Sequence, residues 1–299
     1  MIDLQIAEGL RSRSYPLGYA TLVQRVINKK PHSKETRTDW KKRPLTPQQV
    51  KYALDDVAYV LPVWKKQQKS LKTYGRLDWV FLECDRLIAD IVIETERPRW
   101  ERISGIHKLD QKTLGVVREI SNWRDSHAED RNRPLRQILR DDLVIELARM
   151  KPDTIEELQS IRDMTRRSYQ RIAPELLKAI QKGVQLDKHE LPEKPSLPHI
   201  EKSNNEQVIC QLLGIALSNR CAEMKIARQL VCTNTDLMQL IRHHNSKGNS
   251  KCDARLSEGW RAEVCGNLMT DVLNGQVSMR VAKEGSEFPL VFERVNTQD

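Results

Sequence analysis

The chain has 299 residues, of which 30% are charged and only 5% are aromatic. This length allows two or three domains, and the composition favours charged helical modules over a β-sandwich. The sequence contains neither an apolar run of about 18 residues nor a basic stretch before an apolar core, so it predicts no membrane span and no secretion signal. The six cysteines are widely spaced, which indicates buried thiols in a reducing cytosol rather than a zinc site or a disulfide framework. We therefore expect a cytoplasmic protein with no membrane partner and no small-molecule cofactor.

The net charge of +9 is concentrated near the N-terminus. Residues 11–43 contain ten Lys or Arg against two acidic residues, which gives this segment a charge of +8. Such a run is often only a solvated surface, but it also suits non-specific binding of nucleic-acid phosphates through counterion release. We favour nucleic acid because the run leads directly into the helix described below. The candidate contacts are Lys34, Arg37, Lys41, Lys42 and Arg43.

The elements before residue 75 are predicted in chain order from apolar spacing. A short strand or helix covers 3–10, a turn covers 15–19, helical spacing covers 20–27, and 29–43 is a polar loop. The next helix has strong start signals, because Thr46 can cap it, Pro47 suits the first helical position, and Gln49 completes a capping box. This helix is expected to kink at Pro62.

Two polar side chains share one face of that helix. Tyr52 and Asp56 are four residues apart, which places a phenol and a carboxylate side by side. Taken alone, this pair is also typical of a buried tyrosine beside a solvated aspartate. A second face carries an apolar stripe that we expect to pack against neighbouring structure: Val50, Leu54, Val57 and Leu61.

The rest of the chain is predicted to be largely helical. A helix over 78–93 breaks at 96–100, and 110–183 has the periodicity of a compact helical domain, with Asp153 or Thr154 as a cap and Gly183 just past the last helix. A Pro-rich linker at 191–198 precedes further helical patterns up to residue 273. In that region Trp260 is expected in the core rather than as a base-stacking surface. The tail from 277 to 295 can form a hairpin.

Several of these residues carry a family resemblance. Trp40, Arg43-Pro44-Leu45, Gln49, Tyr52-Ala53, Asp56 and Leu61-Pro62 together resemble the third exonuclease motif of ribonuclease D, of the DEDDy class of 3′–5′ exonucleases, and the resemblance extends upstream through 3–7 and 33–40. The order Trp123-Arg124, Ala128, Asn132, Pro134, Ile138, Asp142, Leu147, Pro152 and Glu157-Leu158 resembles the HRDC domain shared by RecQ helicases and ribonuclease D. Residues 257–261 resemble the start of the last helix in a second HRDC-like domain.

The resemblance implies a mainly α chain: a truncated C-terminal part of an α/β ribonuclease H-like exonuclease domain, followed by two helical HRDC-type domains. The implied segments are an exonuclease remnant at 1–75, a helical linker at 76–107, an HRDC domain at 108–186, a Pro-rich linker at 187–203, and a second HRDC-like domain with a short tail at 204–299. The helices before residue 75 are expected to pack poorly alone, because they would lack the sheet that they cover.

The resemblance also implies a chemistry, hydrolysis of phosphodiesters with two divalent ions held by carboxylates. Asp56 would be the last metal-ligating aspartate, and Tyr52 would hold the attacking water. Asp55 receives no catalytic role, and Asp3 is not counted as a ligand. The family's first two motifs, which include an Asp-x-Glu, do not occur in these residues. We therefore expect that the chain alone does not bind Mg²⁺ or Mn²⁺ stably.

The HRDC resemblance implies nucleic-acid binding by a helical module. Residues 162–182 support this moderately, with six basic residues against two acidic ones, although an idle basic helix face would look the same. The candidate contacts are Arg162, Arg166 and Arg167, and the expected partner is RNA, such as tRNA precursors, or another single-stranded nucleic acid.

Three interpretations remain open. The first is a 3′–5′ exoribonuclease that acts on tRNA 3′ ends and whose missing motifs lie on an upstream part. The second is a non-catalytic nucleic-acid-binding HRDC protein. The third, a helical protein-interaction scaffold, leaves the basic segment 11–43 unexplained and is ranked last.

Overall fold

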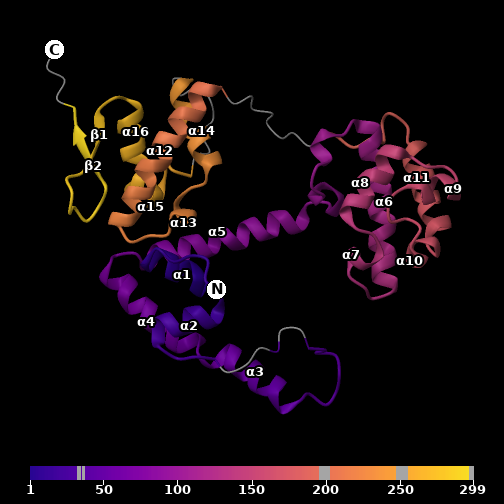
Figure 1. The fold of residues 1–299 in the computed structure, drawn as a ribbon, viewed down its shortest axis with the longest axis horizontal. Coiled ribbons are helices and arrows are strands. Elements are labelled where there is room, and N and C mark those ends of the chain that lie inside the picture. Colours follow the sequence, from indigo (N-terminus) through magenta and orange to yellow (C-terminus); the bar gives the residue numbers. More distant parts are fainter. Residues whose placement is uncertain (32–34, 36–37, 195–202, 247–254, 296–299) are drawn as a thin grey trace. The chain divides into compact units, whose positions relative to one another are not determined.

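The computed structural model describes residues 1–31, 35, 38–194, 203–246 and 255–295. The chain divides into two compact units, one made of Met1–Ala89 with Lys202–Asp299 and the other of Asp90–Glu201. The two segments that the sequence analysis assigns to different domains, 1–75 and 204–299, thus lie in the same unit. Helices dominate both units (Figure 1), so the prediction of a mainly α chain is confirmed.

In the N-terminal part of the first unit, every regular element among the described residues is a helix. Asp3 caps the first helix through hydrogen bonds from the backbone amides of Gln5 (2.7 Å) and Ile6 (3.1 Å), so residues 3–10 form a helix rather than a strand. The elements are α1 (Leu4–Arg11), α2 (Tyr19–Ile27), α3 (Pro47–Ala58), α4 (Val60–Thr73) and α5 (Leu77–Glu96).

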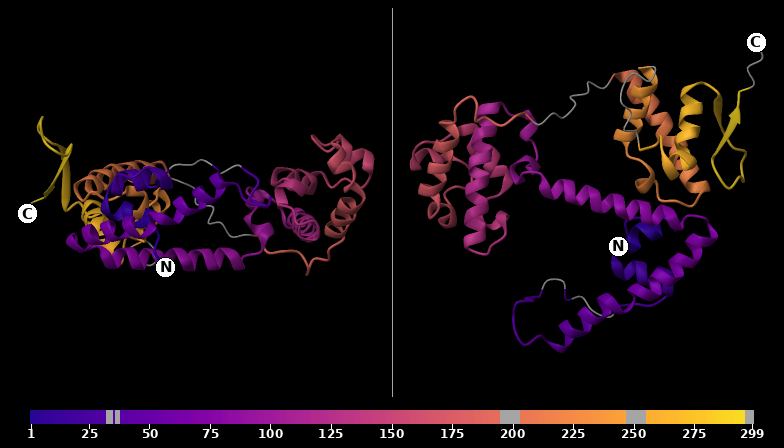
Figure 2. Two further views of the ribbon diagram at one scale, coloured as in Figure 1. Left: turned by 90° about the horizontal axis from the view of Figure 1, so that it is seen from below. Right: turned by 180° about the vertical axis from the view of Figure 1, so that it is seen from behind.

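The C-terminal part of this unit adds helices of different lengths and, among its described residues, one hairpin. The predicted hairpin is confirmed: β1 and β2 pair antiparallel with Met279 opposite Phe292, and Figure 2 shows it, in yellow, beside the last helix. The elements are α12 (Asn204–Glu223), α13 (Arg228–Val231), α14 (Asn234–Asn245), α15 (Gly259–Arg261), the π-helical turn η3 (Ala262–Gly266), α16 (Asn267–Leu273), β1 (Val277–Val281) and β2 (Leu290–Arg294).

One hydrophobic core joins the two parts of the first unit. Ile6 and Leu10 of α1 are almost fully buried in a cluster that also contains Leu217 of α12 and Leu230 of α13. A smaller cluster joins α2 to α4. In the full chain, C-terminal helices and not a sheet cover α1, and α2 packs against α4. The expectation that the segment before residue 75 packs poorly alone stays a prediction.

The second unit packs around its longest helix. α6 lies between α8 and α11, which Figure 1 shows as neighbours, and Thr154 caps α9 as predicted. Gly183, however, lies inside α11 and not past its end. Glycine is required at this position because a Cβ would meet the Cα of Val116 at 2.6 Å, where α6 and α11 are in close contact. The elements are η1 (Arg99–Arg102), η2 (Ile106–Lys108), α6 (Gln111–Asp130), α7 (Leu135–Ile138), α8 (Asp141–Met150), α9 (Ile155–Ser160), α10 (Arg167–Gln170) and α11 (Ala173–Val184).

The cysteines in the described part of the chain are free thiols, and four of the five are buried. Burial raises the pKa of Cys221 and of Cys232 to about 12. These two thiols are therefore protonated and unreactive at neutral pH. Within the described residues, no helix is both long and apolar enough to cross a membrane.

Candidate functional site

The start of α3 is fixed by its own sequence. The hydroxyl of Thr46 accepts a hydrogen bond from the Gln49 amide at 3.1 Å, and the Gln49 side chain accepts one from the Thr46 amide at 2.9 Å, so the predicted capping box is confirmed. The side-chain amide of buried Gln49 also donates to the Thr38 hydroxyl and to the Asp39 carbonyl, both at 3.3 Å. These bonds anchor the basic loop to the helix that follows it.

The end of α3 is set by Pro62. The helix stops at Ala58, and α4 restarts at Val60. Pro62 has no amide hydrogen for the carbonyl of Ala58, four residues earlier, and its ring crowds that carbonyl. The predicted kink therefore becomes a break between two helices. Tyr19 of α2 holds the end of α3 by donating a hydrogen bond from its hydroxyl to the Asp55 carbonyl at 2.9 Å.

Tyr52 and Asp56 lie together on α3, as their spacing predicted. Tyr52 is half-buried against Trp40, with ring centroids 5.8 Å apart, whereas Asp56 is exposed. Partial burial, the negative charge of Asp56 and the hydrogen bond from the Tyr52 hydroxyl to that carboxylate all raise the pKa of Tyr52. At neutral pH this site therefore offers a phenol that donates a hydrogen bond, beside an accessible carboxylate.

The apolar stripe of α3 does not pack as predicted. Val50, Leu54, Val57 and Leu61 are 44–66% exposed. Elsewhere along the same helices, contact with the rest of the unit comes from Gln49 of α3 and from Val63 and Leu71 of α4, which are buried. The expectation that the stripe is buried is thus wrong within the described residues.

Comparisons with known proteins show which families the α3 motif and the rest of the chain match. A model of the 3′–5′ exonuclease family matches residues 1–72, and a model of the HRDC domain matches residues 113–180. A ribonuclease D of Nitrobacter hamburgensis is 29% identical over 287 residues, which cover 95% of this chain and 72% of the relative. The chain is thus similar to ribonuclease D proteins over almost its whole length.

Further relatives show the same similarity. A ribonuclease D of Jannaschia sp. is 26% identical over 97% of this chain and 73% of its own length. The fold is similar to the crystal structure of RNase D from Escherichia coli, described as an exoribonuclease involved in structured RNA processing, with a TM-score of 0.70 and 25% identity over 92% of this chain and 72% of that one. A protein structure from Bifidobacterium adolescentis, 21% identical, shares the fold with a TM-score of 0.64 over 92% of this chain and 73% of that one.

The exonuclease family implies use of a divalent metal, which needs several oxygen ligands. Among the residues that the structure describes, no group of three or more His, Cys, Asp or Glu side chains is placed to hold a metal ion. The candidate ligand Asp56 has one neighbouring carboxylate, that of Asp55. The donors of the described residues therefore do not fit a two-metal site.

The predicted basic contacts of the ribonuclease D-like chain fall into three groups. Lys34 and Arg37 lie outside the described residues. Lys41, Lys42 and Arg43 are exposed in the loop before α3, and the Arg43 guanidinium donates to the Trp40 carbonyl at 2.8 Å.

In the HRDC region, Arg162, Arg166 and Arg167 are exposed, but Arg166 pairs with Asp163 at 2.7 Å. The role of all these residues in nucleic-acid binding stays a prediction.

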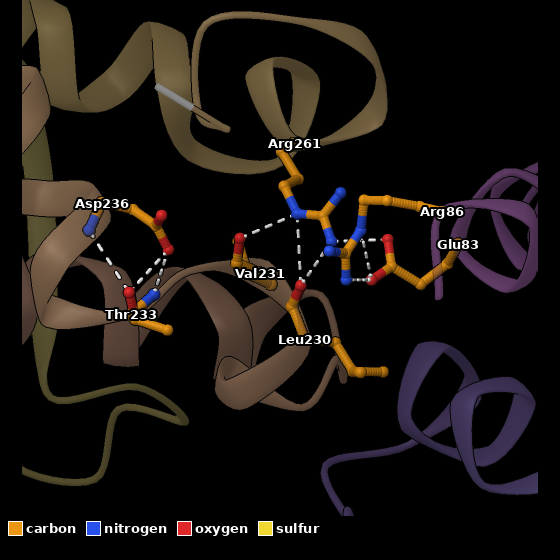
Figure 3. Close-up of polar contacts among 7 residues, drawn as sticks. All are labelled: Glu83, Arg86, Leu230, Val231, Thr233, Asp236 and Arg261. Atoms are coloured by element: carbon orange, nitrogen blue, oxygen red, sulfur yellow. Dashed lines mark hydrogen bonds and ion pairs between the residues drawn. The ribbon is translucent and has the colours of Figure 1, made fainter. Parts of the chain in front are cut away.

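A buried polar network in the first unit escaped the sequence analysis. Glu83 of α5 and Arg261 of α15, both under 10% exposed, form an ion pair at 2.5 Å, and Arg86 also pairs with Glu83 (Figure 3). Arg261 further donates to the carbonyls of Leu230 and Val231 at the end of α13. Burial alone would raise the pKa of Glu83, but its bonds with Arg86 and Arg261 outweigh this effect and lower it.

This network connects residues far apart in the sequence. Glu83 and Arg261 are separated by 178 positions, so no local spacing could pair them. The signals in the sequence are a charged residue within the predicted helix 78–93 and an arginine directly after Trp260, and neither indicates its partner. That tryptophan is 4% exposed and stacks on Trp79 with centroids 5.3 Å apart, which confirms its predicted core position.

Proposed function

We propose that the chain is the RNA-binding part of a ribonuclease D-like 3′–5′ exoribonuclease that trims the 3′ ends of tRNA precursors, with a metal site that these 299 residues do not complete. The observation that carries this proposal is the Tyr52–Asp56 pair, held beside Trp40 on the capped helix α3. The match to a 3′–5′ exonuclease model supports this reaction class, and the match to an HRDC domain supports nucleic-acid binding.

In this proposal each residue of the site has a limited task. Tyr52 is protonated at neutral pH and donates its one proton to Asp56, so its hydroxyl oxygen can hold a water molecule by accepting a hydrogen bond from it. Asp56 offers an exposed carboxylate as one ligand of a shared metal site. Lys41 and Lys42, exposed just before α3, attract the 3′ end of the substrate electrostatically.

The experiment supplies the missing carboxylates from outside the chain. The purified chain is incubated with Mg²⁺ or Mn²⁺ and 3′-labelled RNA, with and without a polypeptide that carries the Asp-x-Glu segment of a ribonuclease D. We expect nucleotide release when both polypeptides are present. Asp56→Ala should lower this release by two orders of magnitude or more, on the order of the loss for a group that acts in the transition state, whereas Asp55→Ala, its sequence neighbour, should retain it.

Two outcomes would contradict the proposal. Release that survives Asp56→Ala would remove Asp56 from the site. Salt-dependent RNA binding without release, even when the second polypeptide is present and folded, would favour the alternative function, that of a non-catalytic HRDC protein that binds nucleic acid.

A further inference from the structure

Five arginines line one pocket of the second unit. The pocket has a volume of about 480 Å³, and its arginines come from η1, α6, α7 and the residue before α8. The first two residues of α8, Asp141 and Asp142, also line the pocket. The arginines are Arg99, Arg102, Arg124, Arg136 and Arg140.

The inner arginines of the pocket are held in place by the fold. Arg124 is only 2% exposed; its guanidinium donates to the Leu139 carbonyl at 3.1 Å and to Asp141 at 2.6 Å, and its Nε is buried without a partner in the described part of the chain. Arg140 donates to Asp142 and, at 2.7 Å, to Asp163. The pocket wall therefore carries two guanidinium groups that the fold holds in fixed positions, and that of Arg124 is almost fully removed from solvent.

The outer arginines have unused donors. Arg136 is exposed and has no ion pair or side-chain hydrogen bond among the described residues. Arg99 is 50% exposed, and the carboxylates nearest to it, those of Asp125 and Glu129, are 3.7 and 3.8 Å away, too far for good hydrogen bonds. Residues 131–140, which contain Arg136, carry four arginines and no carboxylate.

We propose that this pocket binds a backbone phosphate of single-stranded RNA, with Arg136 and Arg99 as the contacting residues and Arg124 as the buried charge behind them. A phosphate suits the pocket because the planar guanidinium fork pairs with two of its oxygens at once. This inference rests on the proposed function, since it requires that the chain binds RNA. It locates the main RNA contact of the HRDC domain away from the predicted residues Arg162, Arg166 and Arg167, which do not line the pocket.

The test compares charge reversals of exposed arginines in the full chain. Arg136→Glu alters the pocket, Arg167→Glu alters the predicted run, and Arg149→Glu, on α8, is a matched control outside both. Binding of a fluorescent single-stranded oligouridylate is measured by anisotropy over a series of salt concentrations.

We expect Arg136→Glu to weaken binding roughly tenfold or more at low salt and to lower the slope of log affinity against log salt by about 1–2. The other two should each change affinity less than about threefold, the effect of a charge beyond the contact. Arg99→Gln should act in the same direction as Arg136→Glu.

The outcomes separate the inference from the proposed function. If the wild-type chain binds the oligonucleotide but Arg136→Glu weakens binding no more than Arg149→Glu does, the pocket is not the site. A larger loss in Arg167→Glu would overturn the inference in favour of the predicted run. If the wild-type chain does not bind RNA at all, the proposed function itself fails. Circular dichroism melting of each variant shows whether it is folded, and Arg99→Gln tests the pocket independently of a charge reversal.

Discussion

Two regions of the first unit differ in what their polar residues do. The motif helix α3 has exposed or half-buried candidate residues and an exposed apolar stripe, and it is anchored by its capping box and by Tyr19. The junction between α5 and α15 instead buries an ion pair, Glu83 with Arg261, under the same core that joins the N-terminal and C-terminal segments. The residues that identify the family thus lie at the surface, and the residues that hold the unit together are unrelated to the candidate site. Stability and activity should therefore respond to different substitutions.

The largest effect is expected at the junction. Glu83→Gln keeps the shape of the side chain but leaves the buried charge of Arg261 without its counterion. Removing one partner of a buried ion pair typically costs about 3–5 kcal/mol, because the remaining charge stays desolvated. We expect the free energy of unfolding in urea, followed by tryptophan fluorescence, to fall by roughly this amount.

Glu293→Gln provides the matched control for this prediction. Glu293 pairs with Arg280 on the hairpin, and both side chains are about half exposed. An exposed pair is screened by solvent and contributes little to stability, so this variant should unfold almost like the wild type. Equal losses in the two variants would mean that burial of the Glu83–Arg261 pair has no particular importance.

The same pair should give the unit a pH dependence. The pKa of Glu83 is lowered below its ordinary value of 4.5 in the folded chain. A carboxyl group whose pKa is lower in the folded chain than in the unfolded chain contributes its full stabilisation at pH values above its pKa in the unfolded chain. This contribution is lost as the pH falls through its pKa in the folded chain. The stability difference between wild type and Glu83→Gln should therefore be constant near neutral pH and shrink below about pH 4.5. Urea titrations of both proteins over this range check it, and a difference that grew on acidification would contradict the assignment.

The sequence was sufficient for features that depend on neighbouring residues. The capping box of Thr46 and Gln49 and the shared face of Tyr52 and Asp56 follow from spacings of a few residues, and the structure contains both. The interruption of the helix at Pro62 is also local, although the structure has a break where the sequence predicts a kink. Local signals reach one turn of helix, so they are reliable at this range.

Contacts between distant segments could not be predicted in this way. Gly183 was assigned to a helix end because glycine is common there, but the approach of Val116 from another helix is what requires it. The pairing of Glu83 with Arg261 and the pocket around Arg124 depend on the tertiary arrangement of several helices. The candidate site on α3 could therefore be predicted because it is local, whereas the buried junction and the arginine pocket could not, because the fold assembles them from distant segments.

The smallest effect is expected on the apolar stripe of α3. Leu54 and Val57 are 61% and 64% exposed, so Leu54→Ser or Val57→Ser removes little buried surface. We expect each variant to change the free energy of unfolding by less than about 0.5 kcal/mol, as is usual for surface positions. By contrast, Leu10→Ala in the core of α1, where the side chain is 0% exposed, should cost about 2–5 kcal/mol. Urea unfolding at two protein concentrations measures all three variants.

A loss above about 1 kcal/mol for Leu54→Ser would mean that the stripe is covered in solution. If that loss also grew with protein concentration, the cover would be a second copy of the chain, since association adds stability by mass action. The contrast between an exposed motif helix and a buried junction would then apply to the separated chain and not to its associated form.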